Sequence, residues 1–248
     1  IKISNFILNY QLFYFILIIN FIVYSYIFYN FIKFYQSYFI FYFFLSGASL
    51  LLLERGNVDI IIFILLYLSF SKNHTFNIIL SLLSIFLKIF PIFLLGRFLN
   101  KKYIISLALV LILSTSYFIL NLEEINLIMA NGPKTGDISY GIFAITSNIN
   151  KHLFIELNYI IISIVLIISL LVLYFLFLRK KMALIQFKNK NMFLAGSGIF
   201  IFTFLITSSY DYRLIFLFFT FPLLLNLKNN LFKNFFLILI ILSSEIHR

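Results

Sequence analysis

The chain of 248 residues contains no cysteine and no tryptophan, and charged side chains are scarce. The absence of cysteine excludes disulfides, thiolate metal sites and cysteine nucleophiles. Charged residues make up 11% of the chain, whereas soluble domains carry about 25%. Hydrophobic residues make up 63%, which is more than a water-soluble fold of this size can bury. The composition therefore predicts a membrane protein.

Sequence motifs for metals, nucleotides and nucleic acids are missing as well. The histidines His74, His152 and His247 are far apart and form no metal-ligand spacing, and no phosphate-binding glycine loop is present. We therefore expect no metal site and no cofactor. The net charge of +11 comes from Lys and Arg in short segments between apolar runs, a pattern typical of membrane topology. We expect no nucleic-acid partner.

Long apolar runs predict an all-α fold, a polytopic transmembrane helical bundle with about eight or nine membrane helices. A spanning helix needs about 20 apolar residues, and the runs are continuous rather than alternating as in a barrel. The predicted helices cover residues 6–30, 34–53, 58–70, 76–99, 103–120, 153–178, 192–208, 214–226 and 231–244. We expect residues 1–248 to form a single transmembrane domain, as a fragment of a longer protein. The Ile, Asn, Lys and Phe content is typical of an AT-rich genome, and we expect a multi-pass protein of a bacterial inner (plasma) membrane.

One stretch between the apolar runs is long and polar. Residues 121–152 are dense in Gly, Pro, Asn and Asp, which marks turns and predicts a loop long enough to be functional. The basic segment Arg179-Lys180-Lys181 is expected on the cytoplasmic side. Counting membrane crossings from there predicts that residues 121–152 are extracytoplasmic.

Two charged strings interrupt the apolar sequence, at Glu54–Asp59 and at Tyr210–Arg213. Ionisable groups flanked by membrane-length apolar runs usually pair with one another or face a water-filled cavity. Each string opens a predicted helix, 58–70 or 214–226, that spans only about 20 Å of a bilayer core about 30 Å thick. We expect both strings to lie below the membrane surface and to line a shared cavity, with helix N-termini that favour anionic groups.

The first string has a structural and a functional interpretation. Asn57 can cap the following helix, with Asp59 in its first turn. Arg55 can pair with Glu54 or Asp59, or it can bind a phosphate through two donors. A capped helix start with an internal ion pair and a substrate contact both fit this pattern.

The second string and an isolated lysine present the same choice. Asp211 and Arg213 are two residues apart, a poor spacing for a pair on one helix, so each is expected to find another partner. Tyr212 would face the same cavity as Arg213. Lys88 lies inside an apolar run, where it can extend to the membrane surface or meet a carboxylate, and Pro91 should kink its helix.

Four segments, in this order, resemble glycosyltransferase family 87. They are Glu54-Arg55-Gly56-Asn57-Val58-Asp59, Lys88-Ile89-Phe90-Pro91, Ser139-Tyr140-Gly141 and Tyr210-Asp211-Tyr212-Arg213-Leu214-Ile215-Phe216. The resemblance implies a GT-C fold and transfer of a hexose, with inversion, from a polyprenyl-phosphate donor. The implied acceptor is an extracytoplasmic glycan or glycolipid, and the implied setting is the lipid bilayer.

The resemblance also implies a catalytic aspartate just after the first membrane helix. The turn at residues 30–34 contains no acid, so this general base is expected upstream of Ile1. Arg55 and Arg213 are candidates for holding the donor phosphate. The full set of candidate substrate-binding residues is Glu54, Arg55, Asn57, Asp59, Lys88, Tyr140, Asp211, Tyr212 and Arg213.

Two other classes of protein fit the same sequence. A multi-pass transporter or a flippase for lipid-linked saccharides also uses broken helices and buried charges. In a scaffold or assembly subunit, the charged strings would be only helix caps and ion pairs. An internal inverted repeat would favour transport, and the sequence shows no convincing one.

Overall fold

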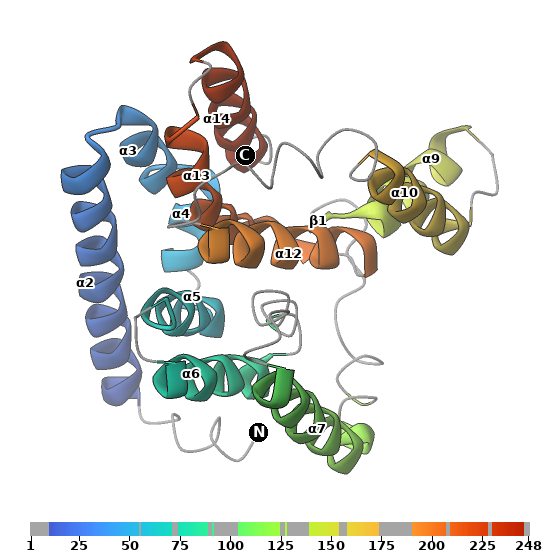
Figure 1. Cartoon of the computed structure of the whole chain (residues 1–248), viewed down its shortest axis with the longest axis horizontal. Coiled ribbons are helices and arrows are strands. Elements are labelled where there is room, and N and C mark those ends of the chain that lie inside the picture. Colours follow the sequence, from blue (N-terminus) through green and yellow to red (C-terminus); the bar gives the residue numbers. More distant parts are fainter. Residues whose placement is uncertain are drawn as a thin grey trace. The chain divides into compact units, whose positions relative to one another are not determined.

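Helices form almost all of the described part of the protein, in agreement with the all-α prediction (Figure 1). The computed structural model describes residues 10–54, 56–70, 74–88, 91, 104–124, 127, 139–153, 158–173, 190–206, 209–227 and 230–245. The chain divides into two compact units. The first unit comprises Ile1–Ile89 and Tyr212–Arg248, and the second comprises Phe90–Asp211. The single transmembrane domain expected from the sequence stays a prediction.

The first unit contains the charged string Glu54–Asp59 and, from the second string, Tyr212 and Arg213. Its helices are α2 (Tyr10–Tyr35), α3 (Tyr38–Phe44), α4 (Gly47–Glu54), α5 (Val58–Leu68), α6 (His74–Leu87), the 3₁₀ helix η4 (Asp211–Thr220, from Tyr212 onward), α13 (Phe221–Leu225) and α14 (Asn230–Glu245). Helix α5 packs against α6 and α2, and α14 packs against α3, α4 and α13. Figure 1 shows α5 and α6 side by side, as the two arms of a helical hairpin.

The second unit contains the polar segment expected as a long loop. Its elements are α7 (Ile104–Leu120), β1 (Ser139–Tyr140), α9 (Ile142–Leu153), α10 (Tyr159–Leu173), α12 (Lys190–Ile206) and β2 (Ser209–Tyr210). The two short strands pair antiparallel, with Ser139 opposite Tyr210 and Tyr140 opposite Ser209. Helix α9 packs against α10 and α12.

The loop prediction for residues 121–152 is wrong at its C-terminal end. Helix α9 begins at Ile142, directly after Gly141, whose φ of 122° suits glycine. Ile142 and Thr146 are buried one helical turn apart, while Ile145 and Lys151 are exposed. A search for continuous apolar runs misses such a helix because polar residues interrupt its apolar ones.

The predicted helix over 34–53 is also wrong, because the chain is broken there into α3 and α4. Helix α2 ends at Tyr35, and Gln36 follows with a φ of 48°, a conformation that cannot continue a right-handed helix. At the break between α3 and α4, the Ser49 hydroxyl donates to the Phe43 carbonyl at 2.8 Å. The buried Tyr24 hydroxyl donates to Ser49 Oγ at 3.0 Å. These hydroxyls satisfy polar groups that the break would otherwise leave without hydrogen bonds.

Aromatic side chains fill the core of the first unit. Phe28, Phe63 and Phe218 are fully buried, and they come from three elements. The Phe218 ring centroid lies 4.2 Å from that of Phe28 and 5.6 Å from that of Phe63. Phenylalanines thus supply the packing between α2, α5 and η4.

One described helix is long and apolar enough to cross a membrane, by length and composition alone. It is the segment Tyr14–Tyr35 within α2, which has a mean hydropathy of 1.9. Six shorter apolar helices in the described part have 10–17 residues. The prediction of eight or nine spanning helices is not confirmed by these lengths. Helix α6, expected over 76–99, ends at Leu87 before Pro91, and residues 92–100 lie outside the described part.

Candidate functional site

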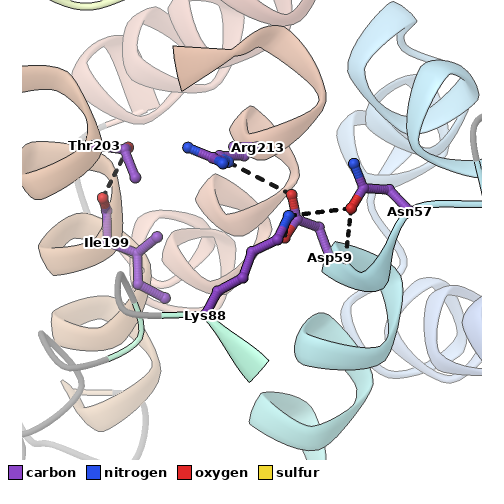
Figure 2. A network of polar contacts seen from close by, with 6 residues as sticks. All are labelled: Asn57, Asp59, Lys88, Ile199, Thr203 and Arg213. Carbon is purple, nitrogen blue, oxygen red and sulfur yellow. Dashed lines mark hydrogen bonds and ion pairs between the residues drawn. The ribbon is translucent and has the colours of Figure 1, made fainter. Parts of the chain in front are cut away.

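Three charged side chains from distant parts of the chain meet in the first unit (Figure 2). Lys88 Nζ lies 2.7 Å from Asp59 Oδ1, and Arg213 Nε lies 3.5 Å from Asp59 Oδ2. The Asp59 side chain is 0% exposed, whereas Lys88 is 25% and Arg213 is 18% exposed. We call Asp59, Lys88 and Arg213 the charge cluster. Of the two expectations for ionisable groups within apolar sequence, the structure shows pairing for these three residues.

Asp59 is held at the start of α5 by the residues just before it. Asn57 has extended backbone angles and caps the helix, because its Oδ1 atom accepts a hydrogen bond from the Asp59 backbone N–H at 3.3 Å. Its Oδ1 also accepts a hydrogen bond from Lys88 Nζ at 3.1 Å. Asn57 therefore joins the helix start to the lysine, as the dashed lines of Figure 2 show.

Lys88 reaches Asp59 because α5 and α6 form a hairpin. The lysine follows the last residue of α6, and its backbone N–H still donates to the Ser84 carbonyl at 3.2 Å. The end of α6 therefore lies next to the beginning of α5. Of the two alternatives left open for Lys88, the structure shows contact with a carboxylate.

Arg213 reaches Asp59 through an unusually long 3₁₀ helix, where the sequence predicts an α-helix over 214–226. That prediction is wrong for residues 214–220, which belong to the 3₁₀ helix, and within the predicted range only Phe221–Leu225 are α-helical. Runs of 3₁₀ helix longer than three or four residues are uncommon. The fully buried sequence that follows Arg213 explains how tertiary packing overrides the usual preference.

Side-chain contacts connect η4 with α5. Three residues of 3₁₀ helix rise about 6 Å, as do four residues of α-helix. Arg213 and Phe216, three apart, therefore face Asp59 and Phe63, four apart. The Phe216 and Phe63 ring centroids are 6.4 Å apart, and those of Phe219 and Phe63 are 4.9 Å apart.

The charge cluster carries two cations and one carboxylate, so it has one surplus positive charge. The carboxylate is fully buried and the two cations are partly exposed. An approaching ligand would therefore meet the ammonium and guanidinium groups before the carboxylate. These donors suit an anion such as a phosphate. Among the described residues, no group of three or more His, Asp or Glu side chains could hold a metal ion.

The structure does not place the other predicted site residues in the charge cluster. Glu54 ends α4 and is exposed, while Arg55 lies outside the described residues. Tyr140 lies in β1, and Asp211 and Tyr212 open η4, but their side chains are outside the described part. Among the first string's acids, the sequence did not separate Glu54 from Asp59. The helix-capping position of Asn57 was the one signal that pointed to Asp59.

Gly56 also positions the site, although no functional role was expected for it. Its φ of 53° lies in the left-handed region, and a Cβ atom there would overlap the Leu17 side chain of α2. We expect Gly56→Ala to lower the free energy of unfolding by about 2 kcal/mol, from backbone strain and steric overlap. Chemical unfolding in detergent measures this loss. Gly198→Ala, inside α12, is the control and should cause no loss, so an equal effect would contradict the role of Gly56.

Comparison of the chain with protein-family models, with curated proteins and with solved structures found no match.

Proposed function

We propose that this chain is part of a membrane glycosyltransferase of the GT-C type. It would transfer a hexose from a polyprenyl-phosphate donor to an extracytoplasmic glycan or glycolipid. The charge cluster is the observation that carries this proposal. Three of the four segments that resemble glycosyltransferase family 87 contribute one cluster residue each, namely Asp59, Lys88 and Arg213. The remaining segment, Ser139-Tyr140-Gly141, lies in the second unit. Its Tyr140 pairs with Ser209, which lies shortly before Arg213 in the sequence.

Exposed apolar side chains support a multi-pass location in the bilayer. On α10, for example, Ile161 is 61% and Val165 is 57% exposed. Helix α14 exposes Phe232, Phe235 and Leu239. Apolar faces of this extent are unfavourable in water and favourable against lipid. We therefore propose that several helices besides α2 contact the bilayer of a bacterial inner membrane.

The chemistry of the proposed reaction needs a cationic site at the leaving group. When the sugar leaves, negative charge builds up on the lipid phosphate. Lys88 and Arg213 would stabilise that charge, and donors fixed before the reaction are the most effective ones. The surplus positive charge of the cluster matches a phosphodiester, which carries one negative charge. Asp59 is engaged by both cations, so the base that activates the acceptor hydroxyl must be another group.

Transfer in vesicles tests this function. Full-length protein would be reconstituted with a polyprenyl-phosphate hexose labelled in the sugar, together with a membrane glycan fraction as acceptor. We expect label to move from the lipid to the acceptor, whereas a nucleotide-sugar donor should give none. Movement of intact donor across the vesicle membrane without transfer would contradict the proposal and indicate a flippase.

A further inference from the structure

We propose that Asp59 is a positioning residue, which holds Lys88 and Arg213 where both can bind one phosphate group, and which does not itself touch the substrate. This inference rests on the proposed function. It assigns to the one buried acid of the charge cluster a role distinct from that of the general base and from that of a substrate ligand.

The burial of Asp59 separates it from an approaching ligand. Its side chain is 0% exposed, and each carboxylate oxygen faces a different cation. A ligand that approaches from the exposed side meets Lys88 and Arg213 first, because only these two groups are partly exposed. Contact between Asp59 and substrate would require one ion pair to break.

The position of Lys88 depends on two oxygen atoms. An ammonium group has three donors in tetrahedral arrangement. Asn57 Oδ1 accepts one of them at 3.1 Å, and Asp59 Oδ1 lies 2.7 Å from Nζ as its ion-pair partner. These two oxygens hold the ammonium group at the start of α5. Asp59 therefore contributes, together with Asn57, to where the ammonium lies.

The two cations come from different elements. Lys88 comes from the end of α6 and Arg213 from η4, so the two residues do not share an element that could set their separation. Two positive charges that both contact one carboxylate also repel each other. The carboxylate between them offsets the repulsion and is a common anchor for both elements.

These observations predict opposite effects of Asp59→Asn on binding and on turnover. The variant raises the cluster from one to two surplus positive charges, so the affinity for a polyprenyl phosphate should rise by about tenfold. Without their shared anchor, the cations should separate, and turnover should fall by about 100-fold. A purely structural role would lower stability without tightening the binding of phosphate.

The experiment measures affinity and turnover separately in full-length protein in nanodiscs. Affinity is measured with a polyprenyl phosphate, with the polyprenol as uncharged control and with inorganic phosphate as the lipid-free anion. Glu124→Gln, which removes an exposed carboxylate outside the cluster, is the matched control and should behave as wild type. Weaker or unchanged phosphate affinity in Asp59→Asn would overturn the proposal.

Asp59→Glu serves as a second variant. It is needed because Asp59→Asn leaves Lys88 and Arg213 without their shared counter-ion, and the loss of that counter-ion can itself prevent folding. Glutamate keeps the charge but displaces it by one methylene group. Phosphate affinity should stay within about threefold of wild type, while turnover should fall by at least about tenfold. Wild-type turnover in this variant would overturn the proposal. If the wild-type protein binds the lipid phosphate but transfers no sugar, the proposed reaction is contradicted. The positioning role of Asp59 is then decided by comparing the phosphate affinities of wild type and Asp59→Asn.

Discussion

Arg213→Ala is expected to reduce sugar transfer by the full-length protein at least about 100-fold while leaving membrane insertion intact. The variant removes the surplus positive charge of the cluster, and with it the attraction for the leaving phosphate. It leaves Asp59 paired with Lys88 at 2.7 Å, so the buried carboxylate still has a counter-ion. The fold should therefore survive, since the severe cost arises when a buried charge loses its only partner.

Transfer rates and the amount of protein extracted from the membrane check this expectation together. Lys33→Ala, which removes an exposed cation from the last turn of α2, is the control and should transfer at the wild-type rate. Arg213→Lys should retain only part of the activity, because an ammonium cannot present the planar pair of donors that a guanidinium does. Normal transfer by Arg213→Ala would remove this residue from the site.

The largest loss of stability is expected for Phe63→Ala, about 3–5 kcal/mol of the free energy of unfolding. Phe63 is 0% exposed and lies at the centre of the aromatic core, between rings of α2 and of η4. Its ring stacks on Phe219 with centroids 4.9 Å apart. Truncation would leave a cavity where η4 contacts α5. Arg213 should therefore also be held less firmly in place.

Reversible unfolding in mixed detergent micelles measures this loss. Phe21→Ala is the matched control, because Phe21 lies on α2 with its ring 50% exposed. Its loss should stay below about 1 kcal/mol, as for other exposed substitutions. A similar loss in both variants would contradict the aromatic core described above.

Several features of the fold and of the site were predictable from local sequence. The start of α5 follows from Asn57 as a cap and Asp59 in the first turn. Apolar runs give α5, α7 and α12 to within a few residues. The cost of isolated buried charge also placed contact with a carboxylate among the two alternatives for Lys88.

Other features depend on tertiary contacts that local sequence does not contain. The sequence does not reveal that Asp59, rather than Glu54, receives both cations, because the two acids have similar neighbours. The break between α3 and α4 depends on hydroxyl hydrogen bonds that involve Tyr24 of α2, far away in the sequence. The 3₁₀ form of η4 occurs in a fully buried segment, whereas an apolar run alone indicates an α-helix.

Arg213 and Phe216 lie three residues apart on η4, and they contact Asp59 and Phe63, which lie four residues apart on α5. One residue added between Arg213 and Phe216 would rotate the guanidinium by about 120° relative to the rings beyond it. Such an insertion would therefore prevent the guanidinium and the Phe216 ring from contacting α5 together.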